Sequence, residues 1–430
     1  MRTSDNNQGN YYVDEIFLPD LKKIGNKNLQ ELIQDNPNIL VFPNTLYENK
    51  DEIDSNVLFE INETQLITNN MMGYIGVNDT QLSISSRFYP EGNDYFLHYM
   101  LQKVFAINLL DLKVNIHEES IWDIFLIYLF PYFLKKALNQ GLYKEYLYKE
   151  YNDANIKGAI NIARHIRINY PFIGKVAYHT REQHTDNRIT QLIRHTVEFI
   201  RNGVIGRNVL NSDNEIRDAI NVVCSATASY CKNERKDIIR KSIKNINHPF
   251  YTEYEILRIV CLQILRREGL TYGKHKDKVY GIIFDGAWLW EEYLNKVLSP
   301  FKFIHPENKT ERNPVYLMGN SKYPRYPDFY HLEKKMVLDA KYKHLEYSGE
   351  IDRNDMHQII SYMYILKSTI GGFLFPYISN SVFPIGELNG YNGAINRYGL
   401  LIPKNSKSFV DFIKTMNYSE KQLTSLLFKN

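Results

Sequence analysis

Two acidic side chains and one basic side chain in this 430-residue chain have the types and spacing for chemistry: Asp328, Asp339 and Lys341. They lie in aromatic and apolar sequence on both sides of the polar pair Glu333-Lys334, which predicts a β-hairpin with that pair as its turn. Counting outward from this turn, Asp328 lies directly across from Asp339. Because side chains alternate along a strand, Asp339 and Lys341 share one face. The hairpin therefore brings two carboxylates and one ammonium together.

Two carboxylates that lie this close repel each other, and burying both without a cation is costly. Mg²⁺ removes that cost, since it typically binds one or two protein carboxylates together with water and phosphate oxygens. The neighbouring lysine can orient a water and offset charge that develops on a phosphate. One interpretation of the pattern is therefore metal-dependent phosphodiester hydrolysis, with Mg²⁺ as cofactor and Mn²⁺ as a substitute. Hairpin geometry alone leaves open a second interpretation, a surface hairpin with an exposed Lys–Asp pair.

Two predicted helices flank the hairpin and carry further candidates. In the upstream helix, Asp285–Leu298, Glu291 falls at the edge of the apolar stripe and Glu292 points into solvent. Glu291 is a candidate third metal ligand, or else a glutamate at the rim of the core. The downstream helix carries Gln358 and Tyr362 four residues apart, on one face.

These residues resemble a known nuclease motif. Pro327-Asp328 followed by Asp339-Ala340-Lys341 is similar to PD-(D/E)xK, and Gln358 to Tyr362 looks like the QxxxY element of its RecB-like branch. The resemblance implies an α/β fold with a C-terminal restriction-endonuclease-like core. It implies that Asp328 and Asp339 hold the metal, that Glu291 completes the ligands, and that Lys341 serves the attacking water. Gln358 and Tyr362 would support the site or the DNA backbone.

Other segments resemble the McrC family, the nuclease subunits of McrBC-type, modification-dependent restriction systems, to which LlaJI-type restriction nucleases are close. The segments that carry this likeness are Gly73–Gly76, Leu82–Arg87, Lys157–Ile162, Tyr178–Glu182, and Asp186–Arg188 with the predicted helix that follows to Ile200. The family often has Pro-Lys where this chain has Ser86-Arg87. The resemblance implies a DNA endonuclease that works with a separate McrB-like AAA+ GTPase hexamer and stimulates its GTP hydrolysis. Taken alone, the charged residues among these segments also fit ordinary surface ion pairs.

Two alternatives to this function remain: a free-standing RecB-like repair or recombination nuclease, and a motor-activating subunit whose nuclease site is residual. The intact Asp328, Asp339 and Lys341 argue against the second. The sequence contains no Walker A motif, since its nearest text, Gly269–His275, lacks the Ser or Thr. We therefore expect any nucleotide-driven motor to be a separate chain.

Composition limits the class of protein. The net charge is only +3, so a nucleic-acid surface must come from local clusters of basic residues, such as those in 232–244 and 266–278. Each cluster is either a solvated face or a DNA contact. The three cysteines fit neither a zinc site, nor a disulfide scaffold, nor a four-cysteine iron–sulfur cluster, which favours a reducing cytoplasm. The N-terminus does not read as a signal peptide, and the apolar run 121–134 is too short to span a membrane.

The hydrophobic pattern divides the chain into three ranges. We expect a β-rich partner-contacting module at 1–95, a mainly helical connecting region at 96–247, and the nuclease domain at 248–430. A fragment starting near His248 would then keep the nuclease fold. At the C-terminus, the pattern predicts strands at 372–376 and 399–403 and two closing helices at 408–414 and 419–428.

Overall fold

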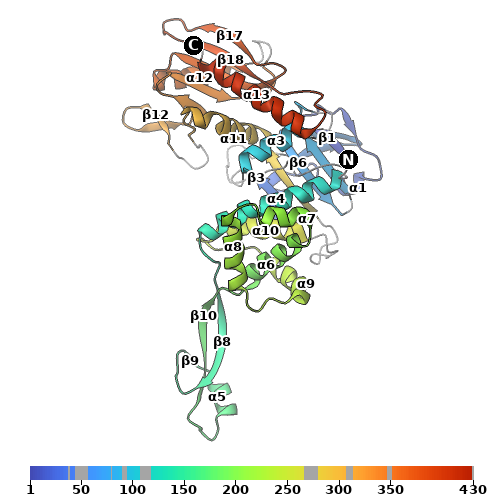
Figure 1. Ribbon diagram of the computed structural model, residues 1–430, viewed down its shortest axis with the longest axis vertical. Helices are drawn as coiled ribbons and strands as arrows, with labels where there is room; N and C mark the ends of the chain where they lie inside the picture. The colour runs from blue at the N-terminus through green and yellow to red at the C-terminus, as the bar shows by residue number, and fades with distance from the viewer. Residues whose placement is uncertain are drawn as a thin grey trace. The chain divides into compact units, whose positions relative to one another are not determined.

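The structure is a computed structural model, which describes residues 1–36, 39–43, 57–78, 80–89, 94–106, 118–265, 279–306, 313–345 and 351–428 (Figure 1). The chain folds into two compact units, one formed by Met1–Asn115 with Asp277–Asn430 and the other by Ile116–Lys276. The basic cluster at 266–278 and the Gly269–His275 segment lie outside the described residues. The three-range division stays a prediction about functional modules.

A five-stranded sheet in the first unit joins the two ends of the sequence. Its order is β1 (Arg2–Ser4), β7 (Thr80–Ser85), β6 (Met71–Val77), β11 (Val279–Asp285) and β3 (Ile39–Phe42). β11 pairs antiparallel with β6 and parallel with β3. At Gly73, where φ is +129°, a Cβ atom would collide with the carbonyl oxygen of Ile282, so the close approach of β6 to β11 requires glycine. β11, the strand that leads into α11 and Glu291, is therefore paired on both sides with N-terminal strands.

Smaller elements complete the N-terminal part of this unit. They are β2 (Tyr11–Tyr12), β4 (Phe59–Asn62), β5 (Gln65–Thr68), α1 (Leu18–Leu21), α2 (Leu29–Asp35) and α3 (Tyr95–Phe105). β2, β5 and β4 form a three-stranded sheet, and its apolar side chains share a buried core with the five-stranded sheet.

A second five-stranded sheet in the first unit carries the candidate residues. Its order is β14 (Phe329–His331), β15 (Met336–Ala340), β16 (Ile370–Tyr377), β18 (Ala394–Leu401) and β17 (Ser381–Glu387). β15, β16 and β18 run parallel, and α12 (Arg353–Leu366) connects β15 to β16. Val337, Phe373 and Ile395 of the sheet pack against Tyr362 and Met363 of α12 in one buried cluster. The site-bearing strand thus has a fixed helix over one face.

The remaining elements of this unit are α11 (Gly286–Leu298), η5 (Ser299–Phe301), β12 (Val315–Met318), β13 (Lys322–Arg325) and α13 (Phe409–Phe428). Trp290 of α11 is fully buried and donates a hydrogen bond from Nε1 to the carbonyl oxygen of Leu374, at 3.3 Å. The prediction of two closing helices is wrong, because α13 continues unbroken through Asn417 and Tyr418. Asn417 and Glu420 accept hydrogen bonds from Tyr99 of α3, and this anchors the middle of the helix.

The second unit combines helices with a long hairpin. Its helices are α4 (Glu118–Asn139), α5 (Ile162–Ile168), α6 (Arg188–Arg201), α7 (Val204–Leu210), α8 (Asn214–Ala226), η3 (Lys232–Glu234), α9 (Arg235–Ser242) and α10 (Glu253–Leu265). β8 (Glu145–Asp153) and β10 (Val176–His184) form the hairpin, with β9 (Ala159–Ile160) on the free side of β10. Figure 1 shows this hairpin projecting from the helices of its own unit. Among the described residues, no helix is both long and apolar enough to cross a membrane.

Candidate active site

The hairpin that carries the candidate residues has the predicted register. Phe329 pairs with Leu338 and His331 pairs with Met336. The backbone N–H of Lys335 donates to the carbonyl oxygen of Leu332, which closes a turn around Glu333-Lys334. One step beyond the Phe329–Leu338 pair, on the side away from the turn, Asp328 lies opposite Asp339.

A short hydrogen bond fixes the Asp328 carboxylate at this position. The backbone N–H of Ala340 donates to Asp328 Oδ2 at 2.6 Å. Asp328 is thereby tied to the strand that carries Asp339, so the two carboxylates cannot easily move apart. This geometry is what the sequence predicted from the turn position alone.

Both carboxylates sit in surroundings that disfavour their charge. The Asp339 side chain is only 4% exposed, and burial raises its pKa although Lys341 opposes the shift. Burial also raises the pKa of Asp328 well above its ordinary value, and the charges of Glu291 and Asp339 raise it further. A pair of this kind is stabilised by a proton or by a bound cation.

Lys341 is held between two carboxylates. Its Nζ lies 2.7 Å from Asp339 Oδ2 and 2.9 Å from Asp355 Oδ1. Burial alone would lower the pKa of Lys341, but the two ion pairs outweigh it and the pKa ends above its ordinary value. The side chain is therefore an ammonium at neutral pH, suited to orienting a water or a phosphate oxygen and not to accepting a proton.

Asp355 is a residue that the sequence analysis missed. It lies in the first turn of α12, and its Oδ2 is also 2.6 Å from Lys343 Nζ. Although burial raises the pKa of Asp355, its hydrogen bonds to Lys343 and Lys341 outweigh that effect and lower it. Asp355, Gln358 and Tyr362 are spaced i, i+3 and i+7, so they share one helix face. That spacing was the available signal.

Gln358 and Tyr362 brace the segment between β13 and β14 that contains Asp328. Gln358 Nε2 donates to the Tyr362 hydroxyl at 2.8 Å, and that hydroxyl donates to the carbonyl oxygen of Tyr326 at 3.3 Å. Burial and the nearby charges of Asp328 and Asp339 raise the pKa of Tyr362 to about 12, so it stays a donor at neutral pH.

The two glutamates of α11 are arranged differently from the prediction. Glu292 does not point into solvent: its side chain is 27% exposed and that of Glu291 is 33% exposed. The reason is His305, whose Nε2 lies 3.7 Å from Glu291 Oε1 and 4.0 Å from Glu292 Oε1. The chain returns over the helix after η5, and a helical wheel cannot show that return. Of these two glutamates, Glu291 is the one whose charge raises the pKa of Asp328.

His305 also contacts the hairpin directly. Its Nδ1 is 2.7 Å from the carbonyl oxygen of Asp328, and because a carbonyl only accepts, Nδ1 carries the proton. Its ring stacks on Phe329 with centroids 5.1 Å apart. Nothing in the spacing of the sequence pointed to this histidine.

The carboxylates at this site supply some, but not all, of the ligands that a hard cation such as Mg²⁺ needs. Asp328 and Asp339 supply two adjacent carboxylates, which is a common protein contribution to a Mg²⁺ site. Within the described residues, no three His, Cys, Asp or Glu side chains already surround one point as a metal site. Glu291 is accordingly an electrostatic neighbour of the pair in this arrangement.

The McrC-like segments of the second unit meet on its hairpin. Gly158 lies against the carbonyl oxygen of His179, where a Cβ atom would collide, so the Lys157-Gly158 pair needs its glycine. An open pocket here is lined by residues of both segments, among them Lys157, Thr180 and Arg181. Lys149 pairs with Glu182 at 3.2 Å, as the ion-pair interpretation of these charges expects.

Comparison with known proteins places the chain in a family. Residues 66–376 match the family described as McrBC 5-methylcytosine restriction system component. No curated protein matches. A chain in the refined half-complex from the tetradecameric assembly of Thermococcus gammatolerans McrB AAA+ hexamers with bound McrC is 15% identical, with a TM-score of 0.42, covering 94% of this chain and 92% of that one.

A chain in the cryo-EM structure of the Thermococcus gammatolerans McrBC complex is also 15% identical, with a TM-score of 0.34. The match covers 70% of this chain and 87% of that one. Since the family match spans most of the sequence, the McrC resemblance predicted from short segments is confirmed: this chain belongs to the family of McrBC 5-methylcytosine restriction system components.

Proposed function

We propose that this chain is the DNA endonuclease subunit of a GTP-dependent, McrBC-like restriction system in the cytoplasm. The observation that supports this most is the convergence of Asp328, Asp339 and Lys341 at one end of the β14–β15 hairpin, with both carboxyl pKa values raised. Structural ion pairs seldom place a buried carboxylate against a second, half-buried one, because the pair costs energy unless a cation joins it. The fold would accordingly be a PD-(D/E)xK nuclease core.

The chain's own residues would divide the work of hydrolysis. Asp328 and Asp339 would hold Mg²⁺, or Mn²⁺ in its place, which would lower the pKa of a bound water and offset charge on the phosphate. Lys341, kept protonated by its ion pairs, would donate hydrogen bonds to the attacking water or to a non-bridging phosphate oxygen. Gln358 and Tyr362 would keep the segment that contains Asp328 in place through Tyr326.

The partner would be a separate McrB-like AAA+ GTPase hexamer. Family membership supports this proposal, because the family is defined as components of McrBC systems. The N-terminal β-rich module and the helical connecting region would contact the hexamer and stimulate its GTP hydrolysis.

The experiment is plasmid cleavage by the purified chain alone, then with the candidate GTPase and GTP, each in Mg²⁺ and in EDTA. Cleavage that needs Mg²⁺, the GTPase and GTP supports the proposal. Mg²⁺-dependent cleavage by the chain alone would support a free-standing nuclease instead. Stimulated GTP hydrolysis without any cleavage would support a subunit that only activates the motor.

A further inference from the structure

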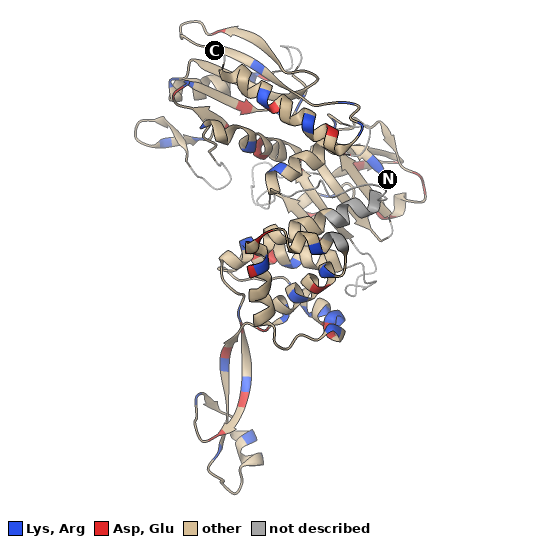
Figure 2. Cartoon of the chain, viewed as in Figure 1, with Lys and Arg blue, Asp and Glu red and all other residues tan. Residues whose placement is uncertain are grey.

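Exposed basic side chains gather along one side of α9 and the residues that follow it. The helix buries Ile238 and Ile239, and its outward face is predominantly basic, as Figure 2 shows. We define the α9 basic patch as four exposed residues: Lys236, Arg240, Lys241 and Lys244. Lys236 and Arg240 lie four residues apart on α9, which places their charges about 6 Å apart along the helix axis, and Lys244 lies two residues beyond the end of the helix.

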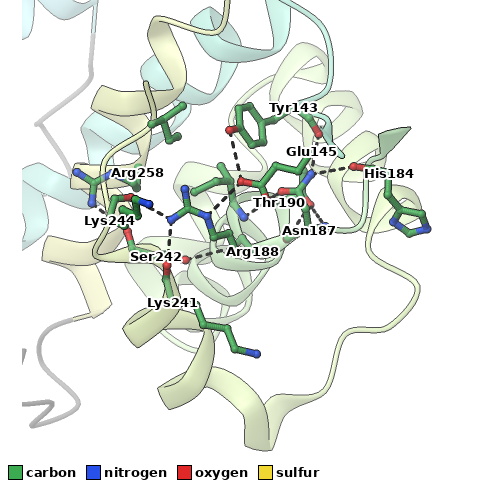
Figure 3. Close-up of polar contacts among 12 residues, drawn as sticks. Tyr143, Glu145, His184, Asn187, Arg188, Thr190, Lys241, Ser242, Lys244 and Arg258 are labelled. Carbon is green, nitrogen blue, oxygen red and sulfur yellow. Dashed lines mark hydrogen bonds and ion pairs between the residues drawn. The ribbon is translucent and has the colours of Figure 1, made fainter. Parts of the chain in front are cut away.

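The main chain under this patch is unusually well held. Arg188 NH1 donates to the carbonyl oxygens of Lys241 and Lys244, at 2.9 and 3.0 Å. Arg258 NH1, fully buried, donates to the carbonyl oxygens of Ser242 and Ile243, both at 3.0 Å. Figure 3 shows this network, with the Lys241 side chain pointing away from it. Two arginines thus donate hydrogen bonds to the carbonyl oxygens at the C-terminal end of α9. In many helices, lysines of the last turn take this role.

The charges of those two arginines are already balanced. Arg188 Nε lies 3.1 Å from Glu145 Oε1, and Arg258 NH2 lies 2.5 Å from Glu255 Oε1. Within the patch, Arg240 has a long, exposed pair with Asp237 at 3.5 Å. Among the described residues, the three patch lysines form no ion pair. The patch therefore presents a net positive charge on a rigid main chain.

The composition of the surface favours a polyanion over a protein partner. Protein–protein interfaces are depleted in lysine and enriched in aromatic residues. Between Lys232 and Asn247, where every residue is described, no large hydrophobic side chain is exposed. Phosphate backbones are instead bound by lysine and arginine side chains, without apolar contacts.

We propose that the α9 basic patch binds the phosphate backbone of double-stranded DNA without reading its sequence. This inference rests on the proposed DNA cleavage for its biological purpose, but the binding itself requires neither metal nor cleavage. The patch belongs to the second unit, so it gives the chain a DNA contact separate from the hairpin that carries Asp328 and Asp339.

The test is the affinity of the full-length chain for a fluorescent duplex of about 30 base pairs, measured in EDTA between about 50 and 200 mM salt. The test variant is Lys236→Gln, Arg240→Gln, Lys241→Gln and Lys244→Gln together. Each phosphate contact contributes about 0.9 to the slope of log affinity against log salt. If each of the four side chains contacts one phosphate, we expect the slope to fall by about 3.6 and the affinity at low salt to fall at least about tenfold.

A second variant removes the same charge elsewhere: Lys404→Gln, Lys407→Gln, Lys414→Gln and Lys421→Gln, all at exposed positions. We expect it to bind DNA almost as the unmodified chain does. An unchanged slope for the patch variant, or an equal loss in both variants, would overturn the proposal. So would intact DNA binding with lost binding to the candidate GTPase, which would assign the patch to a protein. DNA binding that depends on the patch but accompanies no cleavage would instead count against the proposed nuclease function.

Discussion

Asp355 Oδ1 lies 2.9 Å from Lys341 Nζ, an ion pair that joins the first turn of α12 to the end of β15. The other carboxylate oxygen of Asp355 holds Lys343 at 2.6 Å. Asp339 thus does not hold Lys341 alone, and the lysine has a fixed position even when Asp339 binds another cation. This arrangement makes Asp355 a positioning residue for the proposed reaction.

Replacing Asp355 should lower cleavage more than it lowers stability. In Asp355→Asn the charge that directs Lys341 is lost, and a hydrogen bond to a charged group is worth about 1.5–3 kcal/mol. We expect kcat/KM for plasmid cleavage to fall by about 10–100-fold, mostly in kcat. Glu333→Gln, which removes an exposed carboxylate from the turn of the same hairpin, is the matched control. Equal rates for Asp355→Asn and the unmodified chain would show that Asp355 positions nothing.

The two glutamates of α11 offer a second test. The charge of Glu291 raises the pKa of Asp328, whereas that of Glu292 does not contribute to the shift. Both glutamates approach His305. Glu291→Gln should therefore weaken Mn²⁺ binding by several-fold, whereas Glu292→Gln should change it little. Isothermal titration of each variant with Mn²⁺, in the absence of DNA, measures this directly. If Glu292→Gln has the larger effect, Glu291 is not the glutamate that acts on the Asp328–Asp339 pair.

The stability of the second unit should depend on pH through His195. This histidine is fully buried, and neither ring nitrogen has a hydrogen-bond partner in the described part of the chain. Burial, together with Arg235 and Arg194, lowers its pKa from 6.5 to about 4. Between these values the unfolded state binds a proton that the folded state does not, so stability falls as the pH falls.

Urea unfolding at pH 7 and near pH 4 tests this. Relative to His195→Leu, the unmodified chain should lose about 2 kcal/mol of unfolding free energy over that range. The leucine variant removes the titration and keeps a buried side chain of similar size. A constant difference between the two proteins at all pH values would rule out a buried neutral His195.

The parts of the site that depend on residues close together in the sequence were predictable, and the parts that depend on residues far apart were not. The register of Asp328 and Asp339 depended only on a local turn and a period of two, and it was correct. The surroundings of Glu292 depend on His305, which belongs to the chain that follows α11. A helical wheel includes only residues of the helix, so it wrongly predicted that Glu292 points into solvent. Asp355 lay on a predicted helix face, but only the fold shows that Lys341 and Lys343 reach it.

The same reasoning applies to the fold. Short strands and amphipathic helices were predictable where the apolar residues recur at a clear strand or helix spacing. The β8–β10 hairpin was missed, since the segment Tyr143–Tyr151 reads as a local duplication and most of β8 lies partly or fully in solvent, without an apolar face. The pairing of β11 with β6 and β3 was not predictable, because these strands are separated by about two hundred residues of sequence.

That pairing changes what we expect of a fragment starting near His248. The sequence predicted that it keeps the nuclease fold. In the structure, both neighbours of β11 come from the N-terminal segment, so the fragment would expose Ile282, Ile283 and Phe284 on an unpaired strand. We now expect an insoluble or aggregated product. Expression followed by size-exclusion chromatography tests this, and a folded, monomeric fragment would contradict it.

The central claim is metal-dependent DNA cleavage by the hairpin site, and Asp339→Ala tests it most directly. Removing this buried carboxylate relieves repulsion with Asp328 and leaves Lys341 paired with Asp355, so the variant should fold. The measurement is plasmid cleavage in Mg²⁺, with the candidate GTPase and GTP, alongside GTP turnover. We predict cleavage by the unmodified chain, none by Asp339→Ala, and equal stimulation of GTP turnover by both. Cleavage by a folded Asp339→Ala protein at the unmodified rate, or full cleavage in EDTA, would contradict the account.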